Sequence, residues 1–358
     1  MLRSAVLAAM TVMLLPVSAR EGFRWRIDVA DEICRPTVAE ASSMGGIAWV
    51  SNGVYWTVTD EKRKTVMWEM DLPVSPDTGK IGGCSLRMLS RPEGTVDVEG
   101  LVRDPFDGMV WLADERAVAI AKHDPHTGRR LDGPVALPPE MKNTYRDSGI
   151  ESLTMSEDGL VMWTCAEESL RTDGPRATRK AGSYVRLARL ERKSAADPWR
   201  PAGQWVYLTD EVVGKPWYNR KKEDITRSGI SELCLLEDGT LLVLEREFSV
   251  VVIPRLRCRI YETDFTDADN VLGRASLADG ASPPRTVAKR LIHEITGLSM
   301  YEGMCLGPSM KDGSRLLVLV SDGDNRTLQS VMTLRLSRIG ANGSGGAVPS
   351  QGGGKGAK

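Results

Sequence analysis

Carboxylate side chains recur at matching places along the sequence and are the residues best suited to chemistry. Four glutamates lie near the starts of short hydrophobic runs: Glu99, Glu151, Glu232 and Glu302. A second set of acids ends neighbouring hydrophobic runs: Asp60, Glu115, Glu167, Glu245 and Asp322. Gathered carboxylates can bind a hard cation or transfer protons. Which of these they do depends on the elements that position them.

The hydrophobic runs have the two-residue period of β-strands. They are rich in β-branched and aromatic residues and bounded by Gly, Asp or Asn, as in "GVYWTVTD", "GMVWLADE", "TLLVLERE" and "SRLLVLVSD". Stacking them shows one hairpin repeated five times, over residues 44–61, 97–115, 148–168, 228–247 and 301–325. Further strand-like segments follow these hairpins. Repeats of antiparallel strands in groups of four are typical of β-propeller blades.

The repeats predict an all-β chain that forms a β-propeller over residues 20–339, with five countable blades. A degenerate sixth blade in the long interval between the third and fourth hairpins stays open, as does an antiparallel sandwich. After the fifth hairpin only one strand-like segment, "SVMTLRLSRI", remains. We therefore expect the N-terminal segment "FRWRIDVA" to supply the missing strand and close the ring.

In a propeller the first strands of all blades line the central channel, so equivalent positions converge on one mouth. We expect the first-strand glutamates and Asp322 to meet there as metal ligands: Glu99, Glu151, Glu232, Glu302 and Asp322. Calcium fits best because it takes oxygen ligands, whereas the chain has only three histidines and no C-x-x-C pair for zinc or copper. Glu99 and Glu151 are the candidate general bases. Arg246 would hold an anionic substrate, with Arg220, Lys221 and Lys222 nearby.

The same residues have structural alternatives. The four glutamates at strand starts could hydrogen-bond the backbone of neighbouring blades and so fix ring closure. Glu245 and Arg246 could form a local ion pair between adjacent blades. The Asp-Gly pairs within the hairpins are ordinary turn dipeptides and are expected to carry no chemistry.

The two ends of the chain lie outside this repeat. Residues 1–19 combine one arginine, a short apolar run and the small-residue site Val17-Ser18-Ala19, which predicts a secretory signal peptide. The apolar run is too short to span a bilayer, so we expect a periplasmic or secreted protein with no membrane insertion after cleavage. Residues 340–358 form a low-complexity, Gly-rich tail, expected to be disordered.

Composition narrows the partners. A formal net charge of −1 gives no attraction to nucleic acid, so a small anionic substrate or ligand is the expected partner. The sequence leaves the oligomeric state open. The six cysteines are compatible with export, and we expect one disulfide at most.

Four motifs, taken in order, resemble the phytase-like β-propeller family, whose members are labelled "esterase-like activity of phytase". They are "DVEGL", "SGIESL", "GISEL" with "LLVLERE", and "YEGMCLGP" with "LLVLVSDGDN". The resemblance covers about residues 44–336. It implies a secreted or periplasmic propeller that hydrolyses phosphoric esters with calcium in a carboxylate-lined channel.

Three functions follow as hypotheses. The first is a calcium-dependent hydrolase of phosphate or other anionic esters. The second is a non-catalytic propeller that binds a ligand or a protein of the cell envelope. The third is a lactonase-type hydrolase of sugar acids, because such propellers also bring carboxylates to a channel metal.

Overall fold

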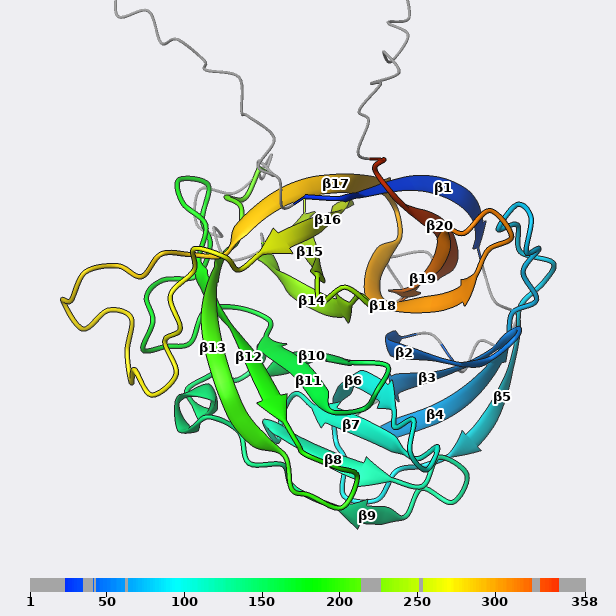
Figure 1. Cartoon of the computed structure of the whole chain (residues 1–358), viewed down its shortest axis with the longest axis horizontal. Coiled ribbons are helices and arrows are strands. Elements are labelled where there is room, and N and C mark those ends of the chain that lie inside the picture. The colour runs from blue at the N-terminus through cyan, green and yellow to red at the C-terminus, as the bar shows by residue number, and fades with distance from the viewer. Residues whose placement is uncertain are drawn as a thin grey trace, which may run out of the picture.

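Five antiparallel sheets, each of four strands, are arranged in a ring in the computed structural model (Figure 1). The structure describes residues 23–34, 41, 43–61, 64–213, 227–250, 254–323 and 329–340. This arrangement confirms the predicted β-propeller. Within the described residues there is no sixth sheet, because the long interval between the third and fourth hairpins holds outer strands of the third blade.

Four of the blades are built from consecutive strands. Blade 1 holds β2 (Met44–Ser51), β3 (Val54–Glu61), β4 (Lys64–Asp71) and β5 (Ser85–Ser90). Blade 2 holds β6 (Val98–Arg103), β7 (Val110–Asp114), β8 (Ala119–His123) and β9 (Arg130–Asp132). Blade 3 holds β10 (Ile150–Met155), β11 (Val161–Ala166), β12 (Tyr184–Glu191) and β13 (Arg200–Leu208). Blade 4 holds β14 (Arg227–Leu235), β15 (Leu241–Val250), β16 (Pro254–Asp264) and β17 (Ala288–Gly297), and one 3-10 turn, η1 (Pro139–Lys142), precedes blade 3.

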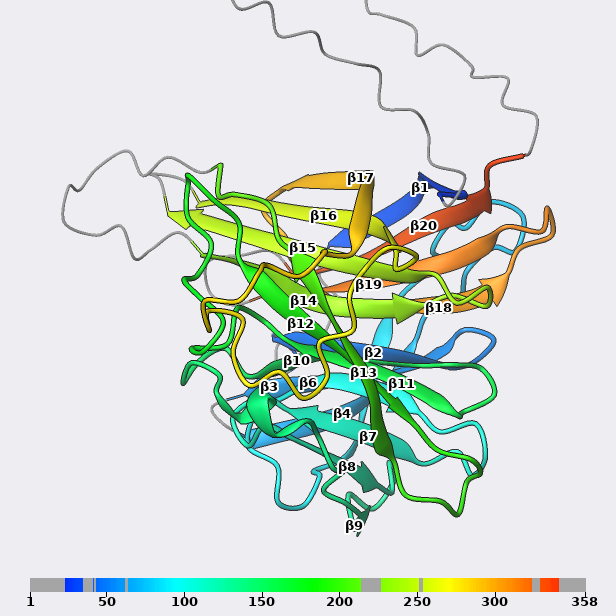
Figure 2. The ribbon, with the colours of Figure 1, turned by 60° about the vertical axis from the view of Figure 1, so that its left-hand side comes forward.

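The fifth blade closes the ring with strands from both ends of the chain. It holds β18 (Met300–Ser309), β19 (Arg315–Asp322), β20 (Ser330–Arg338) and, outermost, β1 (Trp25–Cys34). Trp25 pairs with Arg338, and the side chains of Trp25 and Ile27 are buried. Figure 2 shows β1 beside β17 of blade 4, which it contacts. The prediction that an N-terminal strand completes the last blade is confirmed.

The inner strands meet at the centre of the ring. β2, β6, β10, β14 and β18 lie nearest the centre in Figure 1, and each contacts the next around the circle. Between blades, the alternate faces of the strands pack into hydrophobic clusters that include Trp56, Trp111 and Trp163. All inner strands run in the same direction, so their N-terminal ends gather at one end of the channel.

Several expectations fall on residues that the structure does not describe. The signal peptide of residues 1–19, the tail beyond Gly340, and Arg220, Lys221 and Lys222 lie outside the described residues. Within the described residues, no helix has the length and hydrophobicity needed to cross a membrane. The five cysteines whose side chains the structure describes have free thiols: Cys84, Cys165, Cys234, Cys258 and Cys305.

Candidate functional site

Each inner strand carries a β-bulge near its N-terminal end. The pairing with the second strand shifts by one residue around Glu99 in β6, Glu151 in β10 and Glu302 in β18. A bulge leaves one residue outside the ladder and re-aims its side chain. These three glutamates line one polar cavity at the N-terminal ends of the inner strands, which we call the acidic mouth.

Blade 4 departs from this pattern by one residue. Its bulge falls around Ser231, so Glu232 returns to the ladder opposite Leu244 and does not line the acidic mouth. The Glu232 side chain is buried and accepts hydrogen bonds from the backbone N–H groups of Leu153 and Leu233, at 3.0 Å each. The expectation that Glu232 converges with the other glutamates is therefore corrected: this carboxylate joins blade 4 to blade 3.

The second strands contribute the other half of the mouth. In each second strand of blades 2 to 5, one residue pairs with the inner-strand residue just before the bulge, and the next residue along the chain lines the cavity. These lining residues are Glu115, Glu167, Arg246 and Asp322. Glu245 pairs with Ile230, so it precedes that position and points elsewhere. In blade 4 an arginine thus occupies the place that carboxylates hold in blades 2, 3 and 5. Asp60 follows the corresponding residue of blade 1, but its side chain is not among those described.

The acidic mouth has a volume of about 240 Å³. Its carboxylates are Asp97, Glu99, Glu115, Asp147, Glu151, Glu167, Glu302 and Asp322, and Ser43 and Arg246 complete the described lining. Asp97 and Asp147 were not expected from the sequence. Asp97 opens the "DVEGL" motif two residues before Glu99, and this signal could have identified it. Asp147 lies in the loop before β10 and has no repeated counterpart to mark it.

Arg246 reaches across the mouth from blade 4 to both neighbouring blades. Its Nη2 lies 2.8 Å from Glu167 Oε1 and 3.4 Å from Glu151 Oε1, and its Nη1 pairs with Glu302. Burial lowers the pKa of Arg246, but the charges of the surrounding glutamates outweigh this effect and hold the pKa well above its usual value. The guanidinium therefore stays charged and offsets part of the negative charge around it.

The carboxyl groups of the mouth bind protons more tightly than usual. Burial raises the pKa of Glu115 to about 7, reinforced by the neighbouring charges of Glu167 and Asp97 and opposed by a hydrogen bond from Gly149. Burial also raises the pKa of Glu302 to about 8, although Arg246 acts in the opposite direction. The pKa of Glu151 is raised well above its usual value, mainly by burial and then by Glu167. Protonation and a bound cation are thus alternative ways to relieve the repulsion.

Two groups of carboxylates have the spacing of a cation site. One oxygen each from Asp97, Glu99 and Glu115 lie within 4.8 Å of one another, and the same holds for Glu115, Glu151 and Glu167. Arg246 contacts Glu151 and Glu167 of the second group, and Arg116 Nη2 lies 2.9 Å from Asp97 Oδ2 of the first group. Oxygen-only ligands without histidine or cysteine suit calcium. Both groups therefore have the donor atoms that this ion takes.

Close contact between blades makes the mouth narrow. The Gly149 N–H, just before β10, donates a hydrogen bond of 2.9 Å to Glu115 Oε1 of blade 2. A Cβ atom at Gly149 would lie 1.9 Å from the Glu115 carbonyl oxygen, so only glycine fits there. Gly229 approaches Glu167 of blade 3 in the same way, with 2.7 Å between such a Cβ and the Glu167 carbonyl oxygen.

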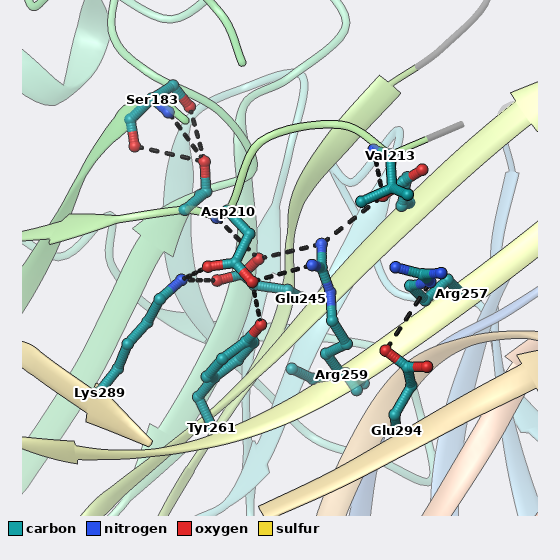
Figure 3. A network of polar contacts seen from close by, with 12 residues as sticks. Ser183, Asp210, Val213, Glu245, Arg257, Arg259, Tyr261, Lys289 and Glu294 are labelled. Carbon is teal, nitrogen blue, oxygen red and sulfur yellow. Dashed lines mark hydrogen bonds and ion pairs between the residues drawn. The ribbon is translucent and has the colours of Figure 1, made fainter. Parts of the chain in front are cut away.

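Glu245 lies on the opposite side of β15 from Arg246, in a buried polar network (Figure 3). Its carboxylate accepts hydrogen bonds of 2.6 Å from the Tyr207 hydroxyl and from Lys289 Nζ. Arg259 Nη2 lies 3.5 Å from Glu245 and 3.7 Å from Glu247. This network ties β15 of blade 4 to Tyr207 of blade 3 and so determines where Arg246 enters the mouth. The alternative of a local ion pair between Glu245 and Arg246 does not describe these contacts.

Comparison with known proteins identifies one family. The family model described as "Phytase-like: Esterase-like activity of phytase" matches residues 40–325. No curated protein matches the chain.

Three of the solved structures with similar folds are the following. A streptogramin B lyase is 12% identical, with 88% of this chain and 98% of that chain covered and a TM-score of 0.31. A periplasmic gluconolactonase of Pseudomonas aeruginosa is 13% identical, with 89% and 99% covered and a TM-score of 0.32. A PQQ-bound aldose sugar dehydrogenase of Streptomyces coelicolor is 13% identical, with 85% and 82% covered and a TM-score of 0.37. These likenesses carry no information about the activity of this chain.

Proposed function

The chain belongs to the phytase-like family, and from this premise we propose that it is an exported, calcium-dependent hydrolase of phosphate or other anionic esters. The observation that carries the proposal is the acidic mouth, where carboxylates from blades 2, 3 and 5 surround one arginine from blade 4. Among the described lining residues, Arg246 is the positive group that a small anionic substrate would meet, together with a bound cation.

In this proposal the bound calcium ion and Arg246 have different roles in the acidic mouth. Asp97, Glu99 and Glu115 would hold calcium, which supplies Lewis-acid polarisation of an ester oxygen when it is bound. Arg246 would bind the anionic group of the substrate and leave part of its present contact with Glu302. Glu151 lines the mouth 3.4 Å from Arg246 and, in its ionised form, would accept the proton of the attacking water.

The decisive experiment measures calcium binding and hydrolysis together. The protein without residues 1–19 is titrated with calcium in a calorimeter and assayed with p-nitrophenyl phosphate, phytate, a carboxylic ester and a sugar lactone. We expect calcium binding and calcium-dependent turnover of a phosphate ester. No heat of calcium binding together with no turnover of any substrate would refute the proposal. Turnover of the lactone alone would instead establish the lactonase-type alternative.

Glu99→Gln and Glu232→Gln form a matched pair for the metal site. Glu99 lies in the candidate calcium group, whereas Glu232 is buried between blades and hydrogen-bonded to the backbone. We expect Glu99→Gln to weaken calcium binding by about 10-fold or more, as loss of one charged ligand does, while Glu232→Gln keeps the parent affinity. Equal loss in both variants, or in neither, would contradict the assignment of the site.

A non-catalytic binding propeller is the second candidate, and one observation favours it. Arg246 already pairs with Glu151, Glu167 and Glu302, so the mouth neutralises part of its own charge without any ligand. The variant Arg246→Gln separates the two functions. For a hydrolase we expect turnover to fall by about 100-fold while calcium still binds, since an anion-binding group is lost. For a binding propeller we expect no turnover in the parent and a loss of stability in the variant.

A further inference from the structure

A second cavity lies at the opposite end of the channel from the acidic mouth. It has a volume of about 410 Å³ and is lined by the C-terminal halves of the inner strands. Most of its wall is apolar, including Val102, Met155, Met304 and Leu306. We call it the apolar pocket. Its size falls in the range of small-molecule sites, which are typically apolar with a few placed polar groups.

Three hydrogen-bond donors in the wall of this pocket have no acceptor among the described residues. They are Arg103 Nε, Trp49 Nε1 and Arg315 Nε, and none of these atoms is exposed to solvent. Trp49 pairs with Tyr55 in blade 1, and Arg103 pairs with Val110 in blade 2, so they hold equivalent positions on the adjacent inner strands β2 and β6. A buried donor that makes no hydrogen bond is costly, and such groups call for an explanation.

The charges around the pocket single out Arg103. Arg315 also lines it, but its Nη1 lies 3.3 Å from Glu157 and also pairs with Glu237. Arg103 has no ion pair within the part of the chain that the structure describes. Glu157, which also lines the pocket, is thus paired with Arg315, and Arg103 is left as a cation without an ion pair among the described residues, on the inner strand next to that of Trp49.

We propose that the apolar pocket binds a small amphipathic carboxylic acid, whose carboxylate accepts hydrogen bonds from Arg103 and Trp49 and whose hydrocarbon part lies against Val102, Met155, Met304 and Leu306. A carboxylate offers two acceptor oxygens to two neighbouring donors and neutralises the guanidinium. The hydrocarbon part leaves water for the apolar wall. This site is separate from the acidic mouth and does not depend on the proposed hydrolase activity.

The test compares ligands of equal chain length and different charge. Octanoate, octanol and octylamine are each titrated into the protein without residues 1–19 by isothermal calorimetry. We expect octanoate to bind about 10- to 100-fold more tightly than the other two, the usual worth of a hydrogen bond to a charged group. Equal binding of octanol would show an apolar cavity without an anion site and would overturn the proposal.

Three variants locate the binding. Arg103→Gln should lose the preference for octanoate over octanol, and Trp49→Phe, which keeps the ring but removes the N–H, should reduce it. Arg87→Gln is the matched control, because Arg87 forms an exposed pair with Glu69 on the outer strand β5. Thermal unfolding of each variant checks that it is folded, and Trp49→Phe decides the matter if Arg103→Gln does not fold. Octanoate binding that survives Arg103→Gln but is lost in Arg246→Gln would place the ligand in the acidic mouth and refute the assignment.

Discussion

Single residue positions decide what the acidic mouth contains. The motifs "SGIESL" and "SGISEL" differ by an exchange of two residues, which places Glu151 on the bulge of blade 3 and Ser231 on the bulge of blade 4. In the second strands, Arg246 takes the position that Glu167 holds in blade 3. Blade 4 thus contributes only a guanidinium to the described lining of the mouth, where blade 3 contributes the carboxylates of Glu151 and Glu167 from the equivalent positions.

The raised pKa values in the mouth predict how stability depends on pH. The pKa values of Glu115 and Glu302 are about 7 and about 8 in the folded chain, raised mainly by burial from 4.5. At pH values between 4.5 and the folded pKa values, the folded chain holds protons that the unfolded chain has released. The free energy of unfolding therefore falls as pH rises from about 5 to 8. A change of one in a pKa value is worth about 1.4 kcal/mol, so we expect a fall of several kcal/mol in the absence of calcium.

Urea unfolding at a series of pH values measures this effect, with a chelator and with saturating calcium. Calcium should reduce the fall, because a bound cation replaces the protons as the means of offsetting repulsion. Glu115→Gln serves as the control and should have a weaker pH dependence than the parent. Stability that rises steadily from pH 5 to 8 in the chelator would contradict the prediction.

At the scale of one element, β15 joins the acidic mouth to the interior. Alternate residues of a strand point to opposite faces, so Glu245 and Glu247 enter the buried network while Arg246 enters the mouth. Asp210, Arg259, Tyr261 and Lys289 complete that network around Glu245 (Figure 3). Because the network includes residues of blade 3 and blade 4, it fixes the position of β15 relative to blade 3.

Two arginines on β16 test the importance of this network. Arg259 is 4% exposed and contacts Asp210, Glu245 and Glu247, whereas Arg257 is 31% exposed and lies 3.8 Å from Glu294. Arg259→Gln should lower the free energy of unfolding by about 3 kcal/mol, because it removes a buried cation that three carboxylates share. Arg257→Gln, its matched control, should change it by about 1 kcal/mol or less. Equal effects in chemical denaturation would show that the network contributes no special stability.

For the whole molecule, stability depends on closing the ring. The fifth blade needs β1 to cover the edge of β20, and β1 buries Trp25 and Ile27 against a cluster shared with blade 4. An uncovered β20 would expose both this apolar surface and a row of unpaired backbone groups. The two ends of the described chain are therefore joined through a single pair of strands.

Removal of β1 should be far more harmful than removal of the tail. A chain beginning at residue 35 should fail to give a cooperative thermal transition, or unfold at least about 10 °C below the chain beginning at residue 20. A chain that ends at residue 340 is the control and should unfold at the parent temperature. Calorimetry checks both variants, and an unchanged transition without β1 would show that blade 5 is complete with three strands.

The repeat was predictable from the sequence because its signals are local. The two-residue period, the Asp-Gly turns and the acidic ends of the strands lie within a few residues of one another, so they indicated the five hairpins and the strand "FRWRIDVA" that closes the ring. The same signals brought Glu99, Glu151, Glu302 and Asp322 to one mouth of the channel.

Only the tertiary structure decided which neighbouring residue enters the mouth. A bulge shifts the facing of a strand by one residue, and its position depends on pairing and on contact with the next blade, as at Gly149 against Glu115. These interactions join residues far apart in sequence. A local pattern therefore could not tell whether the bulge falls at Ser231 or Glu232, or whether Glu245 or Arg246 faces the mouth. For the same reason the unpaired Arg103 and Trp49 of the apolar pocket became visible only in the assembled ring.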